Sequence, residues 1–207
     1  GLLAASREIE SAVDDARAAR GASHSKICIG TPMLDPAPFL AAVLGEFTKL
    51  YPDTSVQVGN RTFEDQRQLL RSGTLDFMIG VLKEQEPGLR DEPLFTDCYV
   101  VAVRQGHPLT ARKTVRVEDL LDFDWVVPNQ GAPRRIAFDQ LFVPTGRLPK
   151  TSIESHSLAT IRATLVDSDR MAILTRSELA AEERMGLLTS IDIGPIRPSP
   201  VIGVTTR

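Results

Sequence analysis

Four short loops of this sequence place hydroxyl, amide or imidazole side chains at the expected starts of helices. The loops are Thr31-Pro32-Met33, Arg61-Thr62-Phe63, Asn129-Gln130-Gly131 and Ser155-His156-Ser157. The first turn of a helix leaves backbone N–H groups unpaired, and α/β folds bind ligands where strands end and helices begin. Each loop alone is explained equally well as a helix cap. The four together predict contacts to a small polar or anionic organic molecule.

Other side chains near these loops have two interpretations each. Arg134 or Arg135 could hold a ligand carboxylate through paired hydrogen bonds, although a solvated surface position is the more ordinary role. His156 lies beside a helix N-terminus, which disfavours its protonated form. It is therefore either a neutral ring that hydrogen-bonds the ligand or an exposed capping residue. Trp125 precedes an apolar strand and is expected in the core rather than stacked on a ligand.

Sequence patterns typical of enzymes are missing. The chain has no HExxH, CxxC, GxSxG, Walker A or GxGxxG motif. Its three histidines, His24, His107 and His156, are far apart and lack metal-ligand spacing. We therefore predict no catalytic residue, no metal site and no cofactor, and we expect that the protein is not an enzyme.

The composition is that of a folded globular protein, with 207 residues, of which 42% are hydrophobic and 25% charged. Aromatic residues make up only 5% and the net charge is −3, which argues against a nucleic-acid-binding surface within this chain. No apolar run is long enough to span a membrane, and no signal-peptide pattern opens the sequence. Cys28 and Cys98 lie in apolar runs, so buried free thiols in a reducing cytoplasm are favoured over a disulfide.

One order of elements occurs twice and predicts two α/β lobes with largely parallel sheets. Strands at 26–30, 54–58 and 75–82 alternate with two helices, and strands at 124–128, 151–154 and 171–175 do the same. We expect the chain to cross into the second lobe near residue 104 and to return near 186. The predicted domains are lobe one at 23–103 plus 187–207 and lobe two at 104–186. Two crossings predict a hinge with a cleft between the lobes.

Residues 2–20 are expected to form a separate helix. Its small apolar residues recur at spacings of three and four, as in a coiled-coil seam, and Gly21 then interrupts the pattern. We interpret 1–22 as a linker or dimerisation helix, with an ordinary surface helix as the alternative. Because the chain begins with Gly1 rather than Met, we expect it to be part of a longer protein.

Several segments, in order and spacing, resemble the effector-binding region of LysR-type transcriptional regulators. These are the helix at 2–20, Ile27-Cys28-Ile29-Gly30-Thr31, the L-x-x-G-x-L-D stretch within 69–80, Glu92-Pro93-Leu94-Phe95, His107-Pro108-Leu109, Val117-Glu118-Asp119-Leu120 and Trp125-Val126-Val127-Pro128. One departure concerns the turn before the strand at 171–175. The family often has Gly-x-Gly there, whereas this chain has Asp167-Ser168-Asp169-Arg170.

The resemblance implies two Rossmann-like lobes of the type 2 periplasmic-binding-protein-like fold, with a small-molecule effector in the cleft. The effector is expected to be an organic acid, an aromatic acid or a sugar. The residues that correspond to the family's effector contacts are Thr31, Pro32, Met33, Thr62, Phe63, Asn129, Ser155, His156 and Ser157. The resemblance further implies that DNA is bound only through an N-terminal helix-turn-helix missing from this chain.

Association and a competing function complete the expectations. The strands at 54–58 and 151–154 are expected at sheet edges, where lobe one of one copy could meet lobe two of another in a two-fold homodimer. The resemblance implies a homotetramer for the full-length protein. The competing function is a solute-binding protein of a transport system with the same fold. An enzyme on a similar two-lobed fold is a third possibility, and it would need a catalytic residue in the cleft.

Overall fold

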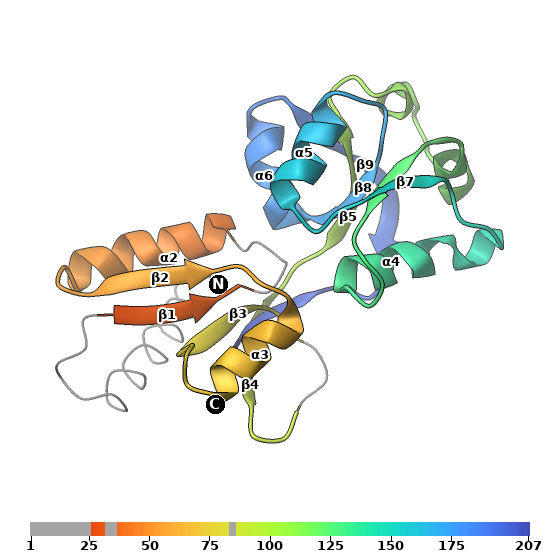
Figure 1. Ribbon diagram of the computed structural model, residues 1–207. Coiled ribbons are helices and arrows are strands. Elements are labelled where there is room, and N and C mark those ends of the chain that lie inside the picture. Colours follow the sequence, from red (N-terminus) through yellow and green to blue (C-terminus); the bar gives the residue numbers. More distant parts are fainter. Residues whose placement is uncertain (1–25, 32–36, 83–85) are drawn as a thin grey trace. The chain divides into compact units, whose positions relative to one another are not determined.

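The computed structural model describes residues 26–31, 37–82 and 86–207, which fall into two α/β units (Figure 1). Unit 1 contains the described residues up to Thr96 together with Val201–Arg207, and unit 2 is Asp97–Pro200. The expected helix at 2–20, the linker domain 1–22, Pro32 and Met33 lie outside the described residues.

Unit 1 is built on a five-stranded sheet in the order β2-β1-β3-β10-β4. The strands are β1 (Lys26–Gly30), β2 (Ser55–Gly59), β3 (Phe77–Val81), β4 (Arg90–Thr96) and β10 (Val201–Thr206). β1, β2 and β3 are parallel, and β10 runs antiparallel to both β3 and β4. The helices α2 (Ala37–Leu50) and α3 (Phe63–Arg71) connect the three parallel strands.

The two faces of this sheet are covered by different helices because side chains alternate along each strand. Ile27 and Ile29 of β1 pack in one core with Phe47 of α2. Cys28, between them, faces a second core that contains Leu70 of α3. Figure 1 shows α2 and α3 on opposite sides of the strands.

Unit 2 repeats this strand order. One of its sheets is β8-β5-β9 and another is β6-β7, and a parallel bridge between Trp125 and Met171 joins them, giving β7-β6-β8-β5-β9. The strands are β5 (Tyr99–Arg104), β6 (Trp125–Val127), β7 (Thr151–Glu154), β8 (Ala172–Thr175) and β9 (Leu188–Ile196). The helices are α4 (Pro133–Phe142), α5 (Leu158–Val166) and α6 (Arg176–Arg184), and three short 3-10 helices are Pro108–Ala111, Val117–Asp122 and Val143–Thr145.

Trp125 is fully buried in the core of unit 2, where its ring meets Phe138 edge to face at 5.2 Å between centroids. Phe142 packs on the same indole at 5.5 Å. The prediction that Trp125 belongs to the core is thereby confirmed. Trp125 thereby anchors strand β6 in the core, and β6 positions the loop that begins at Pro128.

The structure moves both crossings between the units. They lie after Thr96 and after Pro200, not near 104 and 186 as the sequence suggested. The physical reason is strand pairing: β5 pairs antiparallel with both β8 and β9, so both of these strands stay in unit 2. Only β10 returns to unit 1. In each sheet the antiparallel strand lies outside the repeated pattern. In unit 1 this strand is β10, which follows the pattern in the chain, and in unit 2 it is β5, which precedes it.

The cysteine prediction holds only in part. Both thiols are free, but Cys28 is half-buried and Cys98 is exposed. Cys98 lies in the connection between β4 and β5, where the chain passes from one unit to the other, and not inside a strand. Its apolar neighbours in the sequence are residues of β5, which explains the misleading pattern.

Two further findings bear on association and location. β2 and β7 lie at sheet edges, as predicted from the sequence. Among the described residues no helix is long and apolar enough to cross a membrane.

Candidate ligand-binding edges

The parallel strands of unit 1 bring Thr31 and the Thr62 loop to one edge of the sheet. β1 and β2 are neighbours in register, with Gly30 opposite Gly59, so the residues that follow them leave the sheet side by side. Thr31 is buried, and its N–H donates to the carbonyl oxygen of Gly59 at 2.9 Å. Its hydroxyl lies 3.5 Å from the same oxygen, a long contact. Two of the predicted site residues of unit 1 therefore share one strand-end edge.

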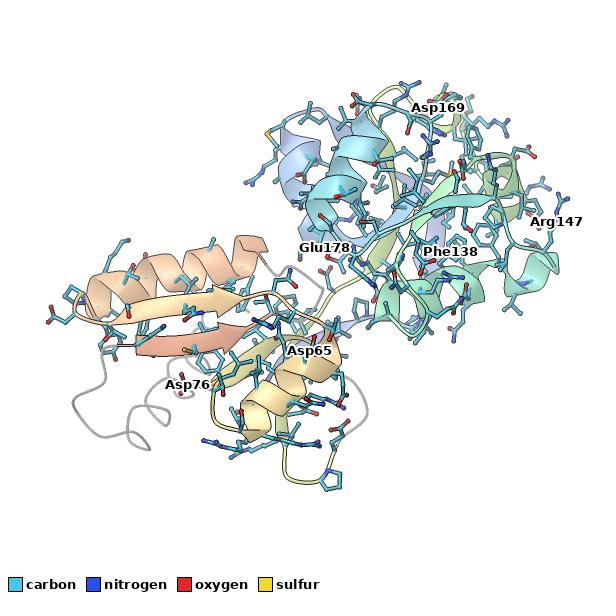
Figure 2. All side chains as sticks on the ribbon, viewed as in Figure 1. Asp65, Asp76, Phe138, Arg147, Asp169 and Glu178 are labelled. Carbon is cyan, nitrogen blue, oxygen red and sulfur yellow. The ribbon has the colours of Figure 1, made fainter. Side chains whose placement is uncertain are left out.

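Thr62 also serves as the N-cap of α3, as the alternative interpretation of this loop stated. Its hydroxyl oxygen accepts from the N–H of Asp65 at 3.2 Å and its hydroxyl donates to the Asp65 carboxylate at 2.7 Å. Phe63 begins the helix half-buried, with the guanidinium carbon of Arg67 4.2 Å from the centre of its ring. Figure 2 shows Asp65 at the start of α3.

Gln66 is a residue of this edge that the sequence analysis missed. It is 1% exposed, and its Nε2 donates to the Gly59 carbonyl at 2.9 Å. Gly59 therefore accepts from both Thr31 and Gln66. The first bond joins the ends of β1 and β2, and the second ties α3 to β2. A buried glutamine on a polar helix gives no signal in the sequence, because glutamine is normally exposed.

In unit 2 the Asn129 loop and the Ser155–Ser157 loop follow neighbouring parallel strands, β6 and β7, and so reach the same sheet edge. Asn129 is exposed, and its carbonyl accepts from Ala132 at 3.3 Å to close the turn before α4. Ser157 caps α5, since its Oγ accepts from the N–H of Thr160 at 3.2 Å. Ser155 Oγ accepts from the N–H of Ser157, also at 3.2 Å. The structure brings these predicted residues together within unit 2.

His156 lies between these two serines and is half-buried. Its Nδ1 is buried without a hydrogen-bond partner among the described residues. A ring nitrogen in this position can accept from or donate to a bound molecule, depending on its tautomer. The role of an exposed capping residue is wrong for His156, because Ser157 caps α5 and His156 is half-buried, whereas its role as a ligand contact stays a prediction.

The arginines that follow the Asn129 loop are not surface residues. Arg134 is 3% exposed, and its Nη1 lies 3.8 Å from Oε1 of the buried Glu178. Arg135 donates from Nε to Asp139 at 3.0 Å and from Nη1 to the carbonyl of Pro128 at 3.3 Å. The solvated position that sequence reasoning favoured is wrong for Arg134, because α6 places an acidic partner against it.

Glu178 and Tyr99 complete a buried polar cluster at the end of β8. Glu178 accepts from the N–H of Thr175 at 2.8 Å, while Thr175 caps α6 in return. Burial raises the pKa of Glu178 against the opposing charge of Arg134, and burial also raises the pKa of the Tyr99 phenol. Tyr99 Oη and Glu178 Oε1 have no hydrogen-bond partner within the described part of the chain. Arg134 and Glu178 give this edge a buried ion pair, and Figure 2 labels Glu178.

The sequence did contain a signal for Glu178. Thr175-Arg176-Ser177-Glu178 fits the capping-box pattern, in which the acidic residue of the first turn folds back onto the N-cap. The motif predicts the position of Glu178 but not its burial, because burial depends on α4 and β5 packing against it. Tyr99 and Arg134 carry no comparable local pattern.

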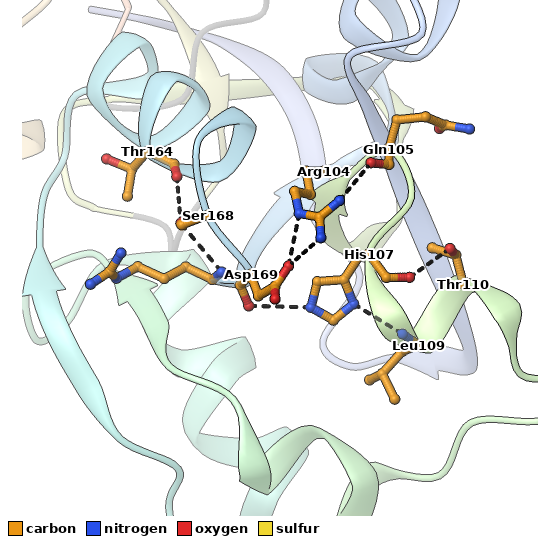
Figure 3. A network of polar contacts seen from close by, with 9 residues as sticks. Arg104, Gln105, His107, Leu109, Thr110, Thr164, Ser168 and Asp169 are labelled. Atoms are coloured by element: carbon orange, nitrogen blue, oxygen red, sulfur yellow. Dashed lines mark hydrogen bonds and ion pairs between the residues drawn. The ribbon is translucent and has the colours of Figure 1, made fainter.

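His107 organises a second network at the opposite side of unit 2, where the turn before β8 departs from the family pattern (Figure 3). His107 is buried, its Nδ1 accepts from Leu109 N–H at 3.2 Å, and its Nε2 lies 3.2 Å from the carbonyl of Asp169. Arg104 donates from Nε to the Asp169 carboxylate at 2.7 Å. Side-chain hydrogen bonds therefore hold the turn in which the family often has glycines. Burial lowers the pKa of His107.

In the described ranges 26–31, 37–82 and 86–207, no three His, Cys, Asp or Glu side chains lie close enough together to hold a metal ion. Besides the charged side chains already described, the polar groups at the two edges include hydroxyls, amides, an imidazole and backbone N–H groups. They are suited to hydrogen-bonding an organic molecule.

The family profile described as "LysR substrate binding domain" matches residues 20–207. The chain belongs to this family. Among curated LysR-type relatives, the HTH-type transcriptional regulator GalR of Pseudomonas putida is 30% identical over 196 residues, which cover 93% of this chain and 49% of the relative. CysL of Bacillus subtilis is 27% identical over 142 residues, covering 68% of this chain and 47% of the relative. The chain thus spans about half the length of these relatives.

Solved LysR regulatory domains share the fold. The regulatory domain of CcmR from Synechocystis PCC6803, in complex with 2-PG, has a TM-score of 0.75 at 22% identity and covers 87% of this chain and 86% of its own. The cofactor-binding domain of the Cbl regulator has a TM-score of 0.77 at 18% identity, covering 90% and 82%. The effector-binding domain of QuiR in complex with shikimate has a TM-score of 0.71 at 18% identity, covering 89% and 88%. The expected type 2 periplasmic-binding-protein-like fold is confirmed. The relatives and structures named here are regulators of transcription, which does not favour a transport protein.

Proposed function

We propose that this LysR domain senses a small organic molecule, an organic acid, an aromatic acid or a sugar, and passes its presence to a DNA-binding helix-turn-helix. The family match over residues 20–207 carries the proposal. The relatives named HTH-type regulators are about twice as long as the matched region, which leaves room for such a DNA-binding part. A regulator of this kind works where the DNA is, so the proposed location is the cytoplasm.

The effector contacts proposed are the strand-end loops of the two units. Thr31, Thr62 and Phe63 lie at the edge of unit 1, while Asn129 and the Ser155–Ser157 loop lie at the edge of unit 2. Pro32 and Met33 belong to the same proposal by their place in the sequence. Backbone N–H groups at helix starts and serine hydroxyls are donors for carboxylate or hydroxyl oxygens. The proposal includes no catalytic step and no cofactor.

The proposed assembly is a homodimer of this domain and a homotetramer of the longer protein. Its basis is the pair of sheet edges, β2 and β7, which present unpaired strands. Val58 of β2 is 43% exposed, while Val56 packs against the core of unit 1. Pairing of β2 from one copy with β7 of another would cover both edges in a two-fold arrangement.

A screen with a thermal-shift readout tests the sensing role. The chain is heated with individual organic acids, aromatic acids and sugars, and an effector raises the melting temperature because it binds only the folded state. Calorimetry then measures the affinity of the hits for the wild-type chain and for Asn129→Ala. A true effector binds more weakly to Asn129→Ala, and unaltered recovery of the compound after incubation supports a sensor rather than an enzyme. A library that produces no shift would count against the proposal.

A further inference from the structure

A cavity of about 170 Å³ lies within unit 1, between the neighbouring strands β1 and β2 and the helix α3. Its lining includes Cys28, Gly59, Arg61, Gln66, Leu69 and Leu75. Thr31, Thr62 and Phe63, the proposed effector contacts of this unit, are not among its lining residues. A dry engineered cavity of about 150 Å³ holds benzene, so this volume is large enough for a one-ring molecule.

The lining combines an apolar surface with one kind of charge. Leu69 and Leu75 offer aliphatic contacts, whereas Arg61 is exposed at the mouth and is the charged member of the lining. Among the described residues, no aspartate or glutamate lines this cavity. A guanidinium beside an apolar surface, without a competing carboxylate, favours a ligand that carries its own carboxylate on an apolar ring.

Gln66 gives the cavity a fixed wall. It is 1% exposed, and its Nε2 donates to the carbonyl oxygen of Gly59 at 2.9 Å. Its Oε1 is buried and faces Gly30, which does not line the cavity. The amide is therefore held by the protein itself, and Arg61 is the polar group of the lining that a ligand anion can pair with.

We propose that this cavity is a second ligand site, for a one-ring organic acid. Arg61 holds the carboxylate, and the leucines contact the ring. The site adjoins the proposed effector contacts of unit 1, because Arg61 directly precedes Thr62 and because Gln66 and Thr31 donate to the same carbonyl oxygen of Gly59.

Cys28 provides a direct readout because its thiol lines the cavity, while the exposed Cys98 in unit 2 is an internal control. The chain is treated with iodoacetamide, and peptide mass spectrometry follows the alkylation of each thiol. The probes are 3-hydroxybenzoate and 4-hydroxybenzoate, with their methyl esters as uncharged controls of the same shape. We expect at least one acid to slow the alkylation of Cys28 without affecting Cys98, and the esters to protect at least about tenfold less well.

Three variants locate the bound acid. Arg61→Gln should raise the concentration for half-protection at least about tenfold, since it removes the partner of the carboxylate. Arg90→Gln makes the same change of charge on an exposed arginine of β4 outside the cavity and should leave protection unchanged. Asn129→Ala alters the proposed effector edge of unit 2 and should also leave it unchanged.

The outcomes separate this inference from the proposed function. The second site is refuted if neither acid protects Cys28 at 10 mM of probe, which corresponds to a Kd on the order of 10⁻² M. It is also refuted if an acid protects Cys28 in the Arg61→Gln variant as well as in the wild type. An acid that raises the melting temperature without protecting Cys28, and that loses this effect in Asn129→Ala but keeps it in Arg61→Gln, would bind at the effector edge of unit 2 instead. The second site would then be abandoned while the sensing role stood.

Discussion

Gly30 and Gly59 face each other across the β1–β2 pair, yet the structure gives a methyl group very different neighbours at the two positions. A Cβ at Gly30 would lie 2.2 Å from Gln66 Oε1 and 2.7 Å from Leu75 Cδ1. A Cβ at Gly59 would meet no atom within 4 Å. The substitutions Gly30→Ala and Gly59→Ala are therefore a matched pair that tests the contact between β1 and α3.

The expected cost at Gly30 follows from these distances. Since ordinary van der Waals contact begins near 3.4 Å, Gln66 Oε1 must move by more than 1 Å, from 2.2 Å. Such a shift disturbs the bond of 2.9 Å from Gln66 Nε2 to Gly59, and a lost buried hydrogen bond costs about 1–3 kcal/mol. Crowding of Leu75 adds to this, while the reduced freedom of the unfolded chain returns about 0.4–1 kcal/mol. We expect a net loss of about 2 kcal/mol.

Urea unfolding followed by circular dichroism measures both variants. Gly59→Ala should remain within about 0.5 kcal/mol of the wild type, as for substitutions that disturb no special feature. The double variant Gly30→Ala/Gln66→Ala should lose less than the sum of the single losses, because the clash and the bond belong to the same side chain. Equal stability of Gly30→Ala and Gly59→Ala would refute the packing described for Gln66.

Four other predictions follow from the structure. Arg134→Met and Glu178→Gln should each destabilise unit 2 by about 3 kcal/mol in urea unfolding, because each change removes one charge of a buried ion pair. The double variant should lose clearly less than the sum of the single losses, and additive losses would contradict a coupled pair. Thr31→Val should weaken a confirmed effector by about 1–3 kcal/mol in calorimetry, and an unchanged Kd would exclude its hydroxyl as a contact. The wild-type chain should lose stability as the pH falls below about 6.5, because His107 has a lowered pKa in the folded state and takes up a proton more readily in the unfolded state. The free energy of unfolding should then fall by at most about 1.4 kcal/mol per pH unit, and His107→Gln should reduce this dependence on pH. Sedimentation at micromolar concentration should show a dimer that Val58→Lys weakens, and a monomeric wild type would rule the dimer out.

Local patterns predicted most elements of this fold because each is encoded by neighbouring residues. Helix α3 begins after its N-cap Thr62 and is followed by a turn in which Gly73 has a positive φ, as the sequence indicated. The edge positions of β2 and β7 also followed from the order of elements. The crossing points were misplaced because the sequences of β5 and β9 do not record which strands they pair with, and only those pairing partners decide which sheet they join.

The candidate site was predictable at its loops and not in its buried groups. Ser155, Ser157 and Asn129 follow strands in the sequence, so their common edge could be deduced from parallel topology alone. Arg134 and Gln66 are buried by contacts with residues distant in the chain, which the sequence around them does not record. Arginine and glutamine are exposed in most proteins, so their residue types predicted exposed positions, whereas both are buried here.

The hydroxyls at the two edges are not equally available to a ligand. Thr62 both accepts from and donates to Asp65, so its hydroxyl is fully used by the helix cap. Ser155 and Ser157 each accept a backbone N–H, and the structure describes no bond that either hydroxyl donates. A hydroxyl that only accepts keeps its proton for another acceptor. The edge of unit 2 therefore offers side-chain donors to an effector oxygen, whereas unit 1 must rely more on the backbone around Thr31 and the start of α3.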